Sequence, residues 1–139
     1  MADAERAYIN FDGASRGNPG PAGAGAIIKD SSGNVLAEVY DYLGENTNNY
    51  AEYKGLILAL EAAAELGERR LVINADSELI VRQLQGRYRV KAPNLIPLYE
   101  QAKKLIAGFD DVELHHVPRA QNEEADRLAN LAIDRAKAG

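Results

Sequence analysis

A chain of 139 residues is long enough to bury one hydrophobic core and too short for two of ordinary size, so we expect a single domain over residues 1–139. Hydrophobic residues (46%) and charged residues (27%) occur at the frequencies of soluble globular proteins, which argues against a disordered chain. The absence of cysteine excludes disulfides, thiolate catalysis and zinc–thiolate sites, and the net charge of −5 is unusual for a protein that binds nucleic acid.

The sequence has no feature of a membrane protein. No apolar run approaches the roughly 20 residues of a membrane span. The first residues, MADAERAYINFDG, have neither a basic start nor an apolar stretch typical of a secretion signal. We therefore expect a cytoplasmic protein without membrane contact, and a monomer, because no exposed apolar helix is evident.

Hydrophobic patterns and turn signals predict five strands. Alternation places Ile9 and Phe11 on one face of the first strand and Asn10 and Asp12 on the other, with Asp12 as the last residue before a loop rich in glycine and proline. The DSSGN turn at 30–34 joins the second and third strands as a hairpin. The expected strands are 6–12, 22–29, 35–43, 70–76 and 112–117.

Four helices are predicted between and after these strands. Thr47, Asn48 and Asn49 are candidate N-caps for a long helix that reaches Leu66, and Gly67 is its stop signal. The other helices are expected at 77–84, 96–107 and 123–137, with PRAQN at 118–122 as a loop. The fourth and fifth strands each follow a helix, which favours parallel pairing. The prediction is an α/β fold: a mixed five-stranded sheet, with three antiparallel and two parallel strands, covered by helices on both faces.

Carboxylates are the candidate chemical groups. On a helical wheel of about 100° per residue, Glu52 lies on the same side as Leu56 and Leu60, so it points inward and needs a partner or a metal ion. Asp12 and Asp76 end strands that meet at one edge of the sheet, where active sites of such folds occur. Turn formation is an equally good interpretation of these two residues.

Asp126 lies in the first turn of the last helix, at the edge of its polar side beside Asn130. A favourable interaction with the helix dipole explains it as well as a functional role does. If the four acids meet, their repulsion requires divalent cations. Oxygen ligands without cysteine or a suitably spaced histidine pair favour Mg²⁺ or Mn²⁺, and two such ions can support an in-line phosphoryl displacement.

Four motifs in this order resemble the type 1 ribonuclease H family: FDGASRGNPGPAGAG, TNNYAEYKGLILAL, INADSELIVRQL and NEEADRLAN. The resemblance covers nearly the whole chain and implies the ribonuclease H-like fold. It also implies that Asp12, Glu52, Asp76 and Asp126 are the metal-binding catalytic carboxylates. The implied activity is endonucleolytic cleavage of the RNA strand of RNA–DNA hybrids by a two-metal mechanism that leaves 5′-phosphate and 3′-hydroxyl ends; double-stranded RNA is a further possible substrate.

The resemblance also implies contacts with the substrate. Asn18 matches the residue that contacts the hybrid in its minor groove, where 2′-hydroxyls distinguish RNA from DNA. Thr47 and Asn49 match positions that hold the phosphate or neighbouring bases of the DNA strand. Helix capping is the alternative role for both, and for Thr47 the two roles are compatible.

Three departures from the family pattern limit the comparison. The loop histidine before the last aspartate is missing, and Arg119 is a hypothetical substitute, whereas His115 and His116 are expected to be ordinary strand residues. Glu78 stands where a neutral amide is common. In place of the long basic protrusion there is only GRYRVKAPN. Its cations, with Tyr88, either bind substrate or form a solvated surface. They are Arg87, Arg89 and Lys91.

Two other functions remain possible from the sequence. Resolvases and integrases share the broader superfamily, although the TNNYAE and GNPGP segments favour the type 1 branch. A catalytically weak or inactive module that binds hybrids is the alternative from another class, and the presence of all four acids argues against it. The predicted partner is an RNA–DNA hybrid, both for an active type 1 enzyme and for an inactive binding module.

Overall fold

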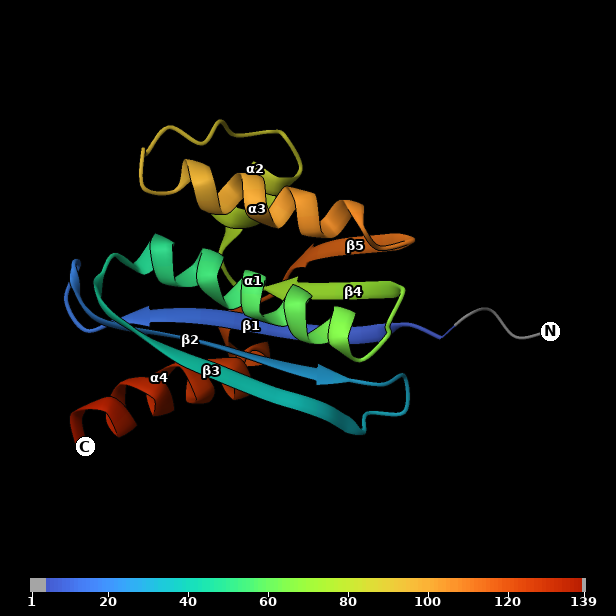
Figure 1. The fold of residues 1–139 in the computed structure, drawn as a ribbon, viewed down its shortest axis with the longest axis horizontal. Coiled ribbons are helices and arrows are strands. Elements are labelled where there is room, and N and C mark those ends of the chain that lie inside the picture. The colour runs from blue at the N-terminus through green and yellow to red at the C-terminus, as the bar shows by residue number, and fades with distance from the viewer. Residues whose placement is uncertain (1–4, 139) are drawn as a thin grey trace.

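The computed structural model describes residues 5–138 and contains a five-stranded sheet in the order β3-β2-β1-β4-β5. Helices α1, α2 and α3 lie on one side of the sheet and α4 on the other (Figure 1). The strands are β1 (Ala7–Ser15), β2 (Gly20–Lys29), β3 (Val35–Asn46), β4 (Arg70–Ala75) and β5 (Asp111–His116). The helices are α1 (Asn48–Glu65), α2 (Glu78–Leu84), α3 (Ile96–Ala107) and α4 (Glu123–Ala138), with a short 3₁₀ helix η1 (Arg119–Gln121) before α4.

The pairing of the strands confirms the predicted sheet. β1 pairs with β2 and β2 with β3 in antiparallel fashion, whereas β4 lies parallel to β1 and β5 parallel to β4. The helical connections before β4 and β5 explain the two parallel pairings, since a parallel partner requires a crossover. Of the single domain predicted over 1–139, residues 1–4 and 139 lie outside the described residues.

β1 is longer than predicted, and this corrects the position of Asp12. The strand does not end at Asp12, because residues 13–15 continue to pair with β2, up to Ser15 opposite Ala22. These residues are too small to give a hydrophobic signal in the sequence. The parallel pairing with β4 does stop here, since Phe11 opposite Ala75 is its last pair. Asp12 is therefore the first residue of β1 that has lost its β4 neighbour.

Other boundaries move by a few residues. β3 extends through Asn46, so the predicted loop at 44–48 is mostly strand, and β2 begins at Gly20. β5 begins and ends one residue earlier than expected. Thr47 is the N-cap of α1 and accepts a hydrogen bond from the Tyr50 amide at 3.2 Å. The predicted stop at Gly67 is confirmed, with a φ of 78°.

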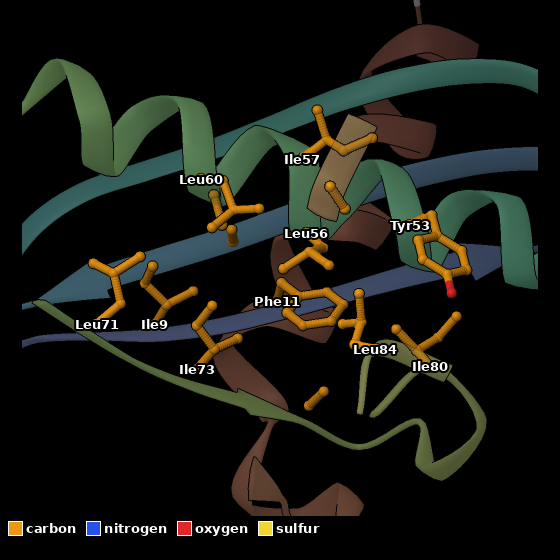
Figure 2. Packing of buried hydrophobic residues seen from close by; sticks show 14 of the residues in the cluster. Ile9, Phe11, Tyr53, Leu56, Ile57, Leu60, Leu71, Ile73, Ile80 and Leu84 are labelled. Carbon is orange, nitrogen blue, oxygen red and sulfur yellow. The ribbon is translucent and has the colours of Figure 1, made fainter. Parts of the chain in front are cut away.

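The main core lies between α1 and the sheet. Ile9 and Phe11 of β1 point toward Leu56 and Leu60 of α1, as Figure 2 shows. This alternation leaves the opposite face of β1 to α4, whose buried residues include Leu128 and Ile133. None of the helices in residues 5–138 is both long and apolar enough to cross a membrane.

α1 and β1 touch through their backbones next to Asp12. A Cβ atom on Gly13 would lie 2.2 Å from the Glu52 nitrogen, and one on Gly55 would lie 2.6 Å from the Asp12 carbonyl oxygen. Any side chain at either position would force the helix away from the strand. The two glycines therefore set the distance between the strand that carries Asp12 and the helix that carries Glu52.

Gly55→Ala tests this contact. Alanine in the middle of an exposed helix normally stabilises it by roughly 0.5–1 kcal/mol relative to glycine. Here we expect a loss of about 1–3 kcal/mol in the free energy of unfolding, because overpacking displaces α1. Denaturant unfolding measures it. Gly108→Ala is the control, since its added Cβ would meet Leu105 O at 3.3 Å, which a shift of a few tenths of an ångström relieves. Equal stabilities of the Gly55 variant and the wild type would contradict the prediction.

Candidate active site

A cavity of about 520 Å³ opens where the parallel pairing of β1 and β4 ends. Its walls come from the end of β1, the start of α1, the turn after β4, η1 and the first turns of α4. Such an edge is where ligands bind in open α/β sheets. The residues that line it are Asp12, Gly13, Ala14, Ser15, Arg16, Asn48, Glu52, Asp76, Ser77, Arg119, Asp126 and Asn130.

Three predicted carboxylates meet in this cavity. Oxygens of Asp12, Glu52 and Asp76 lie within 4.8 Å of one another. Asp12 and Glu52 are each only 5% exposed. The Gly13 amide donates to both, at 2.9 Å to Asp12 Oδ1 and 2.8 Å to Glu52 Oε1. The inward direction predicted for Glu52 is thus confirmed, and one backbone donor holds the two buried acids together.

Burial and the neighbouring negative charges raise the pKa values of Asp12 and Glu52. Burial raises the pKa of Asp12 to about 7, and the charges of Asp76 and Asp126 act in the same direction. Burial also raises the pKa of Glu52 well above its ordinary value, with the neighbouring charge of Asp12 as a further cause. The fully ionised cluster is therefore unfavourable unless a cation compensates it.

Asp126 and Arg119 line the same cavity but stand apart from the three-acid cluster. The charge of Asp126 contributes to the raised pKa of Asp12, which places its carboxylate within electrostatic range. Arg119 lies on η1, at the point where PRAQN was expected to be a plain loop. The structure thus brings all four predicted acids and the hypothetical arginine to one cavity.

Asn122 is a site residue that sequence reasoning missed. Its side chain is buried, and the residue is 1% exposed. The amide nitrogen donates to the Phe11 carbonyl at 2.9 Å and to Asp76 Oδ2 at 3.1 Å, and the amide oxygen accepts from Asn10 at 2.9 Å. Asn122 thereby fixes the turn after β4 and the start of α4 to β1. The only available signal was a polar residue directly before an amphipathic helix.

The residues predicted to contact substrate fall into two groups, one near the start of α1 and one after α2. In the first group, Asn18 Oδ1 accepts a hydrogen bond at 3.1 Å from the Asn48 amide, and Asn48 lines the cavity. Thr47 caps α1, as noted above, and Asn49 lies in its first turn. All three therefore lie around the mouth of the cavity where α1 begins.

The basic segment after α2 forms the second group. Arg87, Arg89 and Lys91 are exposed, and the two arginines line a separate surface hollow of about 450 Å³ with Tyr88. The structure does not bring them to the acidic cavity. No helix or strand occurs in the described segment from 85 to 95, which confirms that this chain is a compact form without the basic protrusion.

His115 and His116 lie on β5, as expected for strand residues. His115 Nε2 contacts Glu113 Oε1 at 3.1 Å on the exposed surface. Residues 117–122 contain no histidine, so the loop before α4 lacks this group. Glu78 pairs with Arg82 one turn along α2, at 3.5 Å.

The residues present fit a divalent metal site. Asp12, Glu52 and Asp76 offer several carboxylate oxygens in a buried setting, and Asp126 stands at the edge of the same space. Buried acids with raised pKa values are compensated when a cation binds. An oxygen-only donor set suits hard ions such as Mg²⁺ or Mn²⁺.

Comparison with known proteins agrees with this site. Residues 10–132 match the family model described as reverse transcriptase-like. Ribonuclease H of Halorhodospira halophila is 36% identical over 88% of this chain and 89% of its own length. The chain belongs to the ribonuclease H family. Ribonuclease HI of Halobacterium salinarum is 48% identical over 94% of the chain.

Solved ribonuclease H structures share the fold. RNase H1 from Halobacterium salinarum has a TM-score of 0.90 at 48% identity, covering 94% of this chain and 98% of that one. LC11-RNase H1, solved in complex with RNA/DNA hybrid, has a TM-score of 0.89 at 43% identity, covering 94% and 99%. Some curated relatives are longer: this chain spans 66% of the Halobacterium salinarum protein and 36% of a 48% identical bifunctional protein of Mycobacterium tuberculosis.

Asp12→Asn tests the electrostatic cost of the site. Without metal, the free energy of unfolding of the wild type should fall as the pH rises from about 4 to about 7, because the unfolded chain releases the Asp12 proton earlier than the folded chain does. The variant lacks this loss, so at pH 8 in EDTA it should be more stable by on the order of 1–3 kcal/mol. Denaturant unfolding at several pH values measures the difference.

Glu61→Gln, on the exposed face of α1, is the matched control for the removal of one negative charge. We expect Mg²⁺ at pH 8 to stabilise the wild type and the control more than the Asp12 variant. The prediction would be wrong if the difference in stability between Asp12→Asn and the wild type, measured in EDTA, were the same at pH 5 and at pH 8. The buried acids would then carry no such electrostatic cost.

Proposed function

We propose that this chain is a metal-dependent endoribonuclease that hydrolyses the RNA strand of RNA–DNA hybrids. The observation that carries the proposal is the cluster of Asp12, Glu52 and Asp76 with Asp126 beside it in one cavity. Membership of the ribonuclease H family supports it, as does the similarity to LC11-RNase H1, which was solved in complex with RNA/DNA hybrid.

The four carboxylates would hold two Mg²⁺ or Mn²⁺ ions. When bound, such ions make water a better nucleophile and stabilise the charge that develops on the scissile phosphate. The role of this chain is to fix the carboxylates. The Gly13 amide orients Asp12 and Glu52, and Asn122 orients Asp76. These backbone and amide donors direct the acids before substrate arrives, which lowers the cost of arranging them in the transition state.

The proposed reaction is hydrolysis at phosphorus. The water oxygen forms a bond to phosphorus as the bond from phosphorus to the 3′ oxygen breaks, and one proton of the water ends on that oxygen. The products are a 5′-phosphate and a 3′-hydroxyl. All four proposed metal ligands belong to one chain, so we propose that a monomer suffices.

Loops around the cavity are proposed to hold the duplex. Asn18 would contact the minor groove, and Thr47 and Asn49 would contact the DNA strand near the start of α1. Arg87, Arg89 and Lys91 would add phosphate contacts farther away. Because Arg87, Arg89 and Lys91 would neutralise phosphates, hybrid affinity should weaken as salt rises.

Cleavage of a labelled hybrid tests the proposal. The wild type should cut the RNA strand with Mg²⁺ or Mn²⁺ and not in EDTA, whereas Asp76→Asn should lose at least about 100-fold in rate, since a lost ligand oxygen weakens the site. Single-stranded RNA is the control substrate and double-stranded RNA a second duplex to compare. Hybrid binding without cleavage in either metal would instead indicate a non-catalytic binding module.

Arg119→Ala tests whether Arg119 takes the role of the missing loop histidine. The guanidinium lines the cavity and is suited to a phosphate oxygen, so we expect about a 10-fold lower kcat with a smaller change in KM. Arg119→Lys should recover part of the rate because it keeps the charge. Steady-state kinetics on the hybrid measure both. Cleavage by Arg119→Ala at the wild-type rate would remove this residue from the mechanism.

A further inference from the structure

Asp126 is held differently from the other three acids. The Gly13 amide binds Asp12 and Glu52, and Asn122 binds Asp76, but Asp126 is bound from within its own helix. The Asn130 amide nitrogen lies 3.0 Å from the Asp126 carbonyl oxygen and 3.3 Å from its Oδ1. Both residues are on α4, one turn apart, and both line the cavity.

Asn130 also has a partner outside the helix. Its Oδ1 accepts a hydrogen bond from Arg16 Nη2 at 3.2 Å, and the same Nη2 lies 2.8 Å from Asp134 Oδ1. Arg16 stands at the start of the connection between β1 and β2, where its backbone nitrogen donates to the Pro21 carbonyl at 2.9 Å. A continuous chain of contacts thus leads from Arg16 through Asn130 to Asp126.

The connection that carries Arg16 also carries Asn18, which we propose to meet the minor groove. Asn18 in turn accepts a hydrogen bond from the backbone of Asn48 at the start of α1. The loop therefore contacts α1 on one side and α4 on the other. The contacts of the loop with α4 are those of the Arg16 guanidinium with Asn130 and Asp134.

The geometry points to Asn130 as a positioning residue for Asp126, with Arg16 coupling that position to the substrate loop. An amide that binds Oδ1 selects one orientation of the carboxylate, and acceptor sites remain for a cation because a carboxylate has about four of them. Arg16 in turn holds the amide so that its nitrogen faces Asp126. This inference rests on the proposed function, since it concerns how that site is completed.

Stability does not account for the Arg16 contacts. The Arg16 and Asp134 side chains are 36% and 62% exposed. Ion pairs this exposed contribute about 0–1 kcal/mol. Losing Arg16 should therefore leave the fold nearly unchanged, which allows positioning to be separated from folding.

Kinetics of Asn130→Ala, Arg16→Ala and the double variant test the inference. We expect Asn130→Ala to lower kcat about 10-fold and to raise the Mg²⁺ concentration for half-maximal rate, with hybrid KM changed less than about twofold. Arg16→Ala should change the same quantities in the same direction by a smaller factor. The double variant should be no slower than Asn130→Ala, because Arg16 acts through Asn130.

Two controls and one direct readout accompany these variants. Arg69→Ala removes an arginine from an exposed ion pair with Asp110 at 2.9 Å, far from the cavity lining, and should behave as wild type. Asn130→Gln keeps an amide and should recover part of the rate. NMR follows the backbone amide signals of α4 while Mg²⁺ alone is titrated into each free protein. We expect the Asp126 amide signal of Asn130→Ala to shift at a higher Mg²⁺ concentration than that of the wild type.

The outcomes separate this inference from the proposed function. A wild type that binds Mg²⁺ but cuts no hybrid overturns the function, while the NMR titration still decides the role of Asn130. A wild type that cuts, together with an Asn130→Ala variant that has unchanged kcat and Mg²⁺ dependence, overturns the positioning role. If Arg16→Ala mainly raises KM and its effect adds to that of Asn130→Ala, Arg16 binds substrate itself and the coupling is wrong.

Discussion

One backbone amide organises the centre of this molecule. The Gly13 N–H donates to Asp12 and to Glu52, so two carboxylates from different elements share a single donor. This is possible because α1 approaches β1 until no Cβ would fit at Gly13. Ile9 and Phe11 of β1 share one hydrophobic cluster with Leu56, Leu60 and Ala63 of α1, and this cluster holds the helix against the strand. The packing of the hydrophobic core thus determines the distance between the Asp12 and Glu52 carboxylates.

The same packing creates an electrostatic cost that the protein alone does not relieve. Asp12 and Glu52 are buried, and the donors that reach them are neutral amides, while Asp76 and Asp126 add negative charge. Buried charges without opposite charges are unfavourable by several kcal/mol each even after the protein relaxes around them. A site arranged this way is stable with a proton or a cation in it. The cation binding that we propose would therefore follow from the burial of the acids and from the Gly13 amide that orients two of them.

The sequence predicted the sheet, its mixed pairing and the inward direction of Glu52, because hydrophobic periodicity reports burial directly. It failed where small residues carry the structure. Residues 13–15 extend β1 without a hydrophobic signal, so Asp12 was wrongly placed at a strand end. Asn122, Arg16 and Asn130 were not identified as site residues, since their roles depend on contacts between segments more than 40 residues apart or on a neighbour one helical turn away. Spacing in one segment does not encode such contacts.

The distribution of charge, more than the net value, explains how a chain of net charge −5 can belong to this family. Four of its 21 acidic residues gather in the cavity, where bound cations would reverse the local sign. Arg16 and Arg119 line the same cavity, and Arg87 and Arg89 line a separate hollow. A phosphate backbone would therefore meet arginines at the rim and repulsion at the centre until metal binds. Metal occupancy and substrate binding are then coupled, because each reduces the electrostatic cost of the other.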